Sequence, residues 1–232
     1  MRIYANGCSW TWGGGIFAPS FSDDLERLKV VWPHHVGETL NCDSVVNLSE
    51  GCGSNERILR TTFDWLSTTD KNTLKDTIAI IQWTDPSRYE FYDTINQKDI
   101  YENNQYRWTS CKTDVVLFRR RWIDPEFHKY HVDLTNRYLS TFADIQGAYK
   151  LLFHVEAIAS LFKEYNIRLI NWSNGTRVEK LPDHIRTHLQ KYEWIPNYLD
   201  WEYERLIDDP HPSLNGHKQI AKYISDYIKE NS

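Results

Sequence analysis

Two side chains near opposite ends of this chain have the types and surroundings that chemistry requires. Ser9 lies in the glycine-bounded segment 6–13, which reads NGCSWTWG and directly follows a short apolar run. His211 lies in the segment 208–212, which reads DDPHP and precedes a helical pattern. A hydroxyl, an imidazole and a carboxylate supply a nucleophile, a base and a group that orients the base. Together they predict acyl transfer through a serine hydroxyl.

Each of these motifs also has an ordinary structural explanation. Gly7 and Gly13 could serve only to permit a tight turn. His211, between two prolines, could be a structural histidine whose hydrogen bonds are satisfied. The chemistry therefore depends on elements that bring the two segments together.

Apolar runs of strand length recur along the chain and alternate with helical patterns. The runs are 3–5, 45–48, 78–81 with Trp83, and 167–172. The helical patterns cover 32–40, 54–65, 139–162 and about 214–228. Nearly continuous apolar strands that alternate with helices are typical of parallel sheets covered on both faces. We therefore predict an α/β fold with a doubly wound parallel sheet, in a flavodoxin-like three-layer α/β/α arrangement.

At 232 residues the chain is expected to form a single domain, 1–232, with a substantial core. The segment from about 86 to 136 interrupts the alternation of strands and helices, and it is polar, aromatic and too long for a simple connection. We interpret it as an inserted aromatic-rich segment. It could form a hairpin or lid beside a site, or it could pack on the sheet edge with no functional role.

Polar segments occur where the predicted strands end. They are 7–13, 47–55 and 82–88, and 208–211 comes before the last helix. In open α/β sheets, ligands bind outside the carboxyl ends of the strands. We expect these four segments, distant in sequence, to converge at one rim of the sheet.

With its motifs in this order, the chain resembles the SGNH (GDSL-type) hydrolase family over almost its full length. The segment 7–9, GCS, resembles the family's Gly-Asp-Ser block, and 32–33, WP, resembles the start of its first helix. The segment 47–51 resembles its glycine block, and 84–85, TD, stands where the family has Asn-Asp. The segment 208–212 resembles the Asp-x-x-His-Pro block and is followed by NGH. The first and last blocks are the more specific ones.

The resemblance implies roles for individual side chains. Ser9 would be the nucleophile and His211 the base. Asp208 would orient the imidazole and is preferred to Asp209, because the family places the acid three residues before the histidine. The oxyanion would be held by the backbone N–H of Ser9, the backbone N–H of Gly51 and the side chain of Thr84. Gly51 is preferred to its neighbour Gly53 by its distance from the following helix.

Two positions depart from the family pattern. Thr84 replaces the usual oxyanion asparagine, and loss of one such donor costs about 10²–10³ in rate in another hydrolase. Thr84 or Arg88 could substitute for it, or activity could be slow, or the fold could be kept for binding. Cys8 replaces the usual aspartate. We interpret it as a small buried residue rather than a thiol nucleophile, because nothing local in the sequence predicts a lowered thiol pKa.

We predict Arg88 and Trp10 as substrate-binding residues. The guanidinium fork of Arg88 matches the geometry of a carboxylate. A surface ion pair between Arg88 and Glu90 is an equally good alternative.

Composition narrows the classes of partner. The net charge of -5 argues against a nucleic-acid binder, and Arg119-Arg120-Arg121 is the only dense basic run. Four cysteines without metal or disulfide spacing, no apolar stretch of membrane length and no signal-like start predict a soluble cytoplasmic protein. Histidines at 34–35, 128 and 131 match no zinc spacing. We therefore expect no metal, no cofactor, no nucleic-acid partner and no membrane partner, while the oligomeric state stays open.

The favoured function is a serine esterase that hydrolyses a small acyl ester, for which an O-acetyl group on a carbohydrate is one hypothesis. The alternative is a catalytically weak or inactive module that binds a glycan or another ligand. A third option is acyl transfer to an acceptor other than water.

Overall fold

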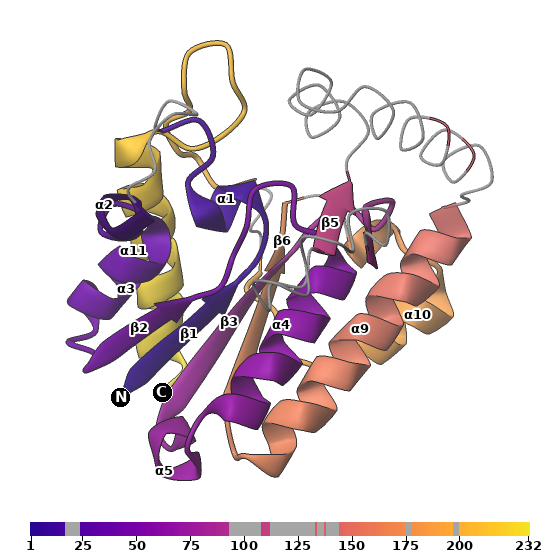
Figure 1. Cartoon of the computed structure of the whole chain (residues 1–232), viewed down its shortest axis with the longest axis horizontal. Coiled ribbons are helices and arrows are strands. Elements are labelled where there is room, and N and C mark those ends of the chain that lie inside the picture. The colour runs from indigo at the N-terminus through magenta and orange to yellow at the C-terminus, as the bar shows by residue number, and fades with distance from the viewer. Residues whose placement is uncertain are drawn as a thin grey trace, which may run out of the picture.

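A four-stranded parallel sheet in the order β2-β1-β3-β6 forms the centre of the computed structural model (Figure 1). The structure describes residues 1–16, 24–92, 108–111, 133, 137, 144–174, 178–196 and 200–232. The sheet strands are β1 (Arg2–Asn6), β2 (Ser44–Asn47), β3 (Thr77–Trp83) and β6 (Arg168–Ser173). The prediction of a parallel α/β sheet is confirmed, and all four predicted strands are present.

Burial of the central strand β3 on both faces explains why polar and apolar residues do not alternate in its sequence. All seven of its residues are buried, and it pairs with β1 on one side and with β6 on the other. Both faces of a central parallel strand are covered by helices, so both sets of alternating side chains must be apolar or fully hydrogen-bonded. A further parallel bridge joins Asn171 of β6 to Trp194 at the outer edge.

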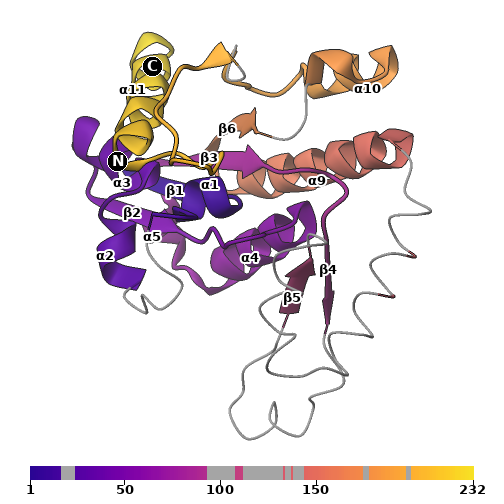
Figure 2. The ribbon, with the colours of Figure 1, turned by 90° about the horizontal axis from the view of Figure 1, so that it is seen from above.

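Helices cover both faces of the sheet and complete three layers (Figures 1 and 2). One face carries α3 (Trp32–Thr39) and α11 (Leu214–Glu230), and the other carries α4 (Asn55–Thr68), α9 (Asp144–Glu164) and α10 (Asp183–Leu189). Short helices fill the connections: α1 (Ser9–Trp12), α2 (Asp24–Leu28), α5 (Lys71–Leu74) and a 3-10 turn at Val178–Lys180. Each face has its own cluster of buried apolar side chains, which is how a single sheet supports two cores.

Local sequence explains where the two site-flanking helices start. Ser54 caps α4 by accepting a hydrogen bond from the Arg57 N–H at 3.2 Å, and Ser213 caps α11 through the Gly216 N–H at 3.1 Å. A run of buried residues three to four positions apart then holds α11 on the sheet: Gly216, His217, Ile220, Ala221, Ile224, Ser225 and Ile228. Both helices therefore begin at fixed points beside the carboxyl ends of the strands.

Besides the short helices α1, α2 and α5, which were not predicted, two further points concern α9 and α10. The helical pattern expected from residue 139 is described only from Asp144, where α9 begins, and residues 139–143 lie outside the described part. Helix α10 was not predicted, because its polar sequence DHIRTHL carries only two core residues, Ile185 and Leu189. Those two side chains are fully buried, so tertiary packing forms a helix that periodicity alone does not reveal.

The expected insertion begins with a two-stranded antiparallel sheet of β4 (Tyr89–Tyr92) and β5 (Trp108–Cys111) (Figure 2). The remainder of 93–132, with the basic run 119–121 and the histidines 128 and 131, lies outside the described residues, so the expectation of a lid stays a prediction. Among the helices that the structure describes, none is both long and apolar enough to cross a lipid bilayer.

Candidate active site

The turn after β1 presents Ser9 as the first residue of α1. Cys8 caps this helix in an extended conformation, and its N–H donates to Gln82 Oε1 on β3 at 3.0 Å. Thr11 Oγ1 donates to the same oxygen at 3.1 Å. A Cβ on Gly7 would lie 2.5 Å from Thr11 Oγ1 and 2.7 Å from Gln82 Oε1, so this turn has room only for glycine. The serine is therefore held on a rigid strand–turn–helix junction.

A tight loop before α11 brings the histidine to this turn. The Leu206 N–H donates to His211 O at 3.0 Å, and the Ser213 N–H donates to Glu204 O at 2.9 Å. These bonds close a hairpin-like loop, whose tip projects over α1. His211 Nε2 lies 2.7 Å from Ser9 Oγ, across 202 positions of sequence. The distance is that of a good hydrogen bond, and it joins the two ends of the chain.

The carboxylate on the other ring nitrogen belongs to Asp209. Asp209 Oδ1 accepts the His211 N–H at 2.8 Å and also contacts His211 Nδ1. The prediction that Asp208 takes this position is wrong, because the loop is tighter than the three-residue spacing assumed. Asp208 lies at the exposed tip with a φ of 60°, in the left-handed region, whereas the side chain of Asp209 folds back over its own loop.

The surroundings of Asp209 favour its charged form. Partial burial alone would raise the pKa of its carboxyl group, but the backbone N–H and the ring of His211 outweigh it and lower that pKa. An ionised carboxylate at Nδ1 keeps a proton on that nitrogen and leaves Nε2 free to accept one from Ser9.

Three groups predicted to bind an oxyanion have no hydrogen-bond partner among the described residues. They are the Ser9 N–H, the Gly51 N–H and the hydroxyl of Thr84. Thr84 is only 1% exposed, and its hydroxyl oxygen is completely covered. Buried hydrogen-bonding groups rarely remain without a partner, so the covered Thr84 hydroxyl is the unusual member of this set.

Gly51 and Gly53 occupy different positions. Gly53 packs against the turn that carries Ser9, because a Cβ added to it would lie 3.0 Å from Gly7 O. Its N–H already donates to Glu50 O at 3.1 Å. Gly51 faces the ring of Trp12, and its N–H is uncommitted among the described groups. This difference favours Gly51 as a donor.

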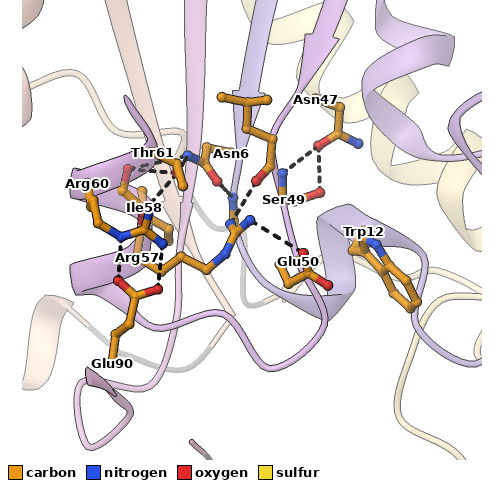
Figure 3. Close-up of polar contacts among 12 residues, drawn as sticks. Asn6, Trp12, Asn47, Ser49, Glu50, Arg57, Ile58, Arg60, Thr61 and Glu90 are labelled. Carbon is orange, nitrogen blue, oxygen red and sulfur yellow. Dashed lines mark hydrogen bonds and ion pairs between the residues drawn. The ribbon is translucent and has the colours of Figure 1, made fainter. Parts of the chain in front are cut away.

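The segment that carries these glycines is fixed by polar contacts on both sides (Figure 3). Asn47 Oδ1 accepts the N–H of Ser49 at 3.1 Å and its hydroxyl at 2.5 Å. From the other side, Arg57 of α4 donates to Leu48 O at 2.8 Å and reaches Glu50 at 3.5 Å. The backbone of 47–50 is therefore anchored to α4 before it approaches Ser9.

Cys8 is fully buried, with its Sγ 4.0 Å from Ser9 Oγ and 3.9 Å from Asn174 Nδ2. Burial alone would raise the pKa of this thiol, but the positive charge of Arg88 and the backbone N–H of Trp10 outweigh burial and lower that pKa. The expectation that Cys8 has no positive charge nearby is thus wrong, because Arg88 arrives from a different segment. The base nevertheless bonds to Ser9, not to Cys8.

The two residues predicted to bind substrate both lie near the serine. The ring of Trp10 is 6.3 Å from the ring of His211 and 5.6 Å from that of Tyr203. Arg88 is 9% exposed and donates to Gly53 O at 3.3 Å. Its alternative partner, Glu90, pairs instead with Arg60 at 2.7 Å (Figure 3).

From the sequence, Asp209 was ranked behind Asp208, and two further residues of the site, Gln82 and Asn174, had no assigned role. Asp209 has the same residue type as its neighbour Asp208, and only the loop geometry separates them. Gln82 belonged to a polar segment but had no assigned role. Asn174, whose Oδ1 accepts a hydrogen bond from Gln82 Nε2 at 2.6 Å, belongs to no motif that the sequence analysis identified. Within the described ranges, no three metal-ligating side chains form a cluster.

Comparison with known proteins places this geometry in context. The model of a family of unknown function, DUF6071, matches residues 21–124, which is less than half of the chain. No curated protein matches the sequence. Among solved structures, TesA aligns with a TM-score of 0.53 and 12% identity over 99% of both chains. The psychrotrophic esterase EstA from Pseudoalteromonas sp., inhibited by monoethylphosphonate, aligns with a TM-score of 0.51 and 12% identity, over 99% of this chain and 97% of that one.

The chain has the SGNH hydrolase fold. The resemblance drawn from its motifs is thereby confirmed at the level of the fold. At 12% identity, the likeness extends to the fold alone, and the chemistry of the site depends on the side chains of this chain.

Proposed function

We propose that this protein is a serine-dependent ester hydrolase whose catalytic residues are Ser9, His211 and Asp209. The observation that carries the proposal is the chain of contacts from Ser9 Oγ to His211 Nε2, at 2.7 Å, and from His211 Nδ1 to the carboxylate of Asp209. This connectivity is the one that lets an imidazole activate a hydroxyl. The SGNH fold of the chain supports the same reaction class by analogy.

In the proposed reaction, Ser9 Oγ attacks the ester carbonyl while His211 Nε2 takes its proton. The carbonyl oxygen becomes an oxyanion, which the Ser9 N–H, the Gly51 N–H and the Thr84 hydroxyl would hold. The protonated His211 then gives its proton to the departing alcohol, leaving an acyl group on Ser9. A water molecule, activated by the same imidazole, releases the acid and restores the hydroxyl.

The substrate is proposed at the level of a small acyl ester. An O-acetyl group on a carbohydrate remains one hypothesis, because segment 86–136 is rich in aromatic residues that can stack on sugar rings. Most of that segment lies outside the described residues, so the proposal does not depend on it.

Labelling with a fluorophosphonate tests the nucleophile directly. We expect the wild-type protein to be labelled at Ser9, as located by peptide mass spectrometry, and to hydrolyse 4-nitrophenyl acetate. Ser9→Ala should lose both properties while its melting temperature stays nearly unchanged, because only one hydroxyl is removed. Ser67→Ala, on exposed α4 surface, is the matched control and should behave like wild type. Labelling elsewhere, or turnover that survives Ser9→Ala, would contradict the proposal.

Thr84 stands where the SGNH family has its oxyanion asparagine. This difference favours a second candidate function, a module that binds a ligand without turnover. Tight glycan binding that Ser9→Ala does not change, with no hydrolysis of any ester, would favour that candidate. Product analysis in the presence of small alcohols separates hydrolysis from acyl transfer, since transfer forms a new ester instead of the free acid.

A further inference from the structure

Arg88 is a buried arginine that has no carboxylate partner among the described residues, unlike Arg60 and Arg168. Arg60 pairs with Glu90 at 2.7 Å and Arg168 pairs with Glu193 at 2.6 Å. Arg88 is 9% exposed, more buried than either guanidinium, and forms no ion pair within the described residues. Its Nε is completely covered and has no acceptor there. A buried guanidinium stays charged at any physiological pH, so leaving it unpaired is costly.

The acidic residues closest to Arg88 in the described sequence, Asp85 and Glu90, bind other groups, and so does Glu56 of α4. Glu90 accepts two hydrogen bonds from Arg60 at 2.9 and 2.7 Å. Glu56 binds Lys150 at 2.5 Å, and the Lys150 ammonium also donates to Arg88 O at 3.4 Å. Asp85 accepts the Ser87 N–H at 2.9 Å. None of them neutralises the guanidinium.

The position of Arg88 is set by backbone and lies at the candidate site. Its N–H donates to Asp85 O at 3.1 Å, in the short connection between β3 and β4. Its guanidinium donates to Gly53 O at 3.3 Å, and the absent Cβ of Gly53 would lie 3.6 Å from Cys8 Cα. The charge of Arg88 is therefore fixed next to the residue that precedes Ser9.

We propose that Arg88 binds a carboxylate of the substrate, so that the natural ester carries a negative charge close to its scissile bond. This inference rests on the proposed ester hydrolysis and narrows its substrate class. Such a substrate supplies a negative charge to the guanidinium of Arg88. A planar guanidinium can donate two parallel hydrogen bonds to one carboxylate. The carboxylate can belong to the acyl part, as in the half-ester of a dicarboxylic acid, or to the alcohol part, as in an acylated hydroxy acid.

Two pairs of esters that differ only in charge test the inference. For the acyl side the pair is 4-nitrophenyl hemiglutarate and its methyl ester. For the alcohol side it is 4-acetoxybenzoate and its methyl ester. We expect wild type to prefer the charged member of one pair. Arg88→Gln should lower kcat/KM for that ester on the order of 10²-fold and change its neutral partner by no more than about threefold. Arg88→Lys should restore part of the preference.

The control for net charge is Arg2→Gln, since Arg2 lies at the opposite end of β1 and donates to backbone carbonyls of 72–75. It should leave the charge preference unchanged. If Arg88→Gln slows charged and neutral esters equally, Arg88 acts on the oxyanion instead and the inference is overturned. Absence of any charge preference in wild type overturns it as well.

A binding measurement separates failure of this inference from failure of the proposed function. Calorimetric titration with glutarate and with 4-hydroxybenzoate requires no turnover. Binding of either anion that Arg88→Gln weakens at least about tenfold supports the carboxylate site, even if none of the four esters is hydrolysed. If the esters are hydrolysed but neither anion binds, or both bind equally to Arg88→Gln, the inference fails while the proposed function stands.

Discussion

At the scale of single residues, the site depends on which of two adjacent aspartates faces the histidine. Asp208 and Asp209 are chemically identical, yet one sits at an exposed tip with a φ of 60° and the other contacts His211 Nδ1. Because the backbone N–H of His211 also donates to Asp209, the carboxylate and the ring are positioned by the same turn. The orientation of the imidazole is thus a local property of a few residues.

Substitution of each aspartate by asparagine tests that assignment. Asp209→Asn should lower kcat on 4-nitrophenyl acetate by about 10³–10⁴-fold, because the amide no longer favours the tautomer that accepts the Ser9 proton. Asp208→Asn, the matched control one residue away, should change kcat by less than about threefold, since its side chain is exposed and makes no contact with the ring. The reverse order of effects would return the role to Asp208.

At the scale of elements, the contact between α11 and α3 involves a second histidine with a structural role. His217 is fully buried on α11, and its Nδ1 accepts the Trp32 N–H at the start of α3, at 3.1 Å. Burial, assisted by the nearby His35 and His211, lowers the pKa of His217 to about 3. The folded protein therefore keeps this imidazole neutral, while the unfolded chain protonates it near its ordinary pKa.

The stability should accordingly fall as the pH drops. Between the ordinary pKa of about 6.5 and the folded value of about 3, only the unfolded chain binds the proton, so each pH unit costs about 1.4 kcal/mol. From pH 7 to pH 5, the free energy of unfolding of wild type should decrease roughly 2 kcal/mol more than that of His217→Asn, whose amide oxygen keeps an acceptor for Trp32. Urea titrations at both pH values measure this, and equal decreases would contradict it.

At the scale of the whole molecule, an ion pair attaches the root of the insertion to the sheet domain. Arg60 of α4 and Glu90 of β4 form two hydrogen bonds at 2.9 and 2.7 Å, and the Glu90 side chain is only 3% exposed (Figure 3). The connection between β3 and β4, which carries Thr84 and Arg88, is thereby held between two fixed points. The ion pair therefore fixes β4 to α4 close to the segment that carries Thr84 and Arg88.

Removal of one charge from that pair should destabilise the protein. Glu90→Gln removes the carboxylate charge that faces the partly buried Arg60 guanidinium and should reduce the free energy of unfolding by about 2 kcal/mol or more. The double substitution Arg60→Met with Glu90→Met should recover much of the loss, because no uncompensated charge remains. Asp226→Asn breaks the exposed Lys222–Asp226 pair and should cost less than about 1 kcal/mol. Equal losses in Glu90→Gln and Asp226→Asn would argue against this role.

The order of the four main strands and of the helices α3, α4, α9 and α11 could be predicted from the sequence, as could the parallel sheet. Those features follow from local rules: apolar runs for buried strands, caps such as Ser54 and Ser213, and the placement of ligand segments at the carboxyl ends of parallel strands. Periodicity failed for α10, whose two core residues are too few to form a pattern.

Only the tertiary structure decided which polar atoms meet. The choice between Asp208 and Asp209 depends on a backbone turn, and the pairing of Glu90 with Arg60 leaves Arg88, beside Cys8, with no carboxylate from the part of the chain that the structure describes. Such partnerships join segments that are far apart in sequence or differ by one residue in register, so composition and spacing carry no record of them. They are fixed by the packing of complete elements against one another.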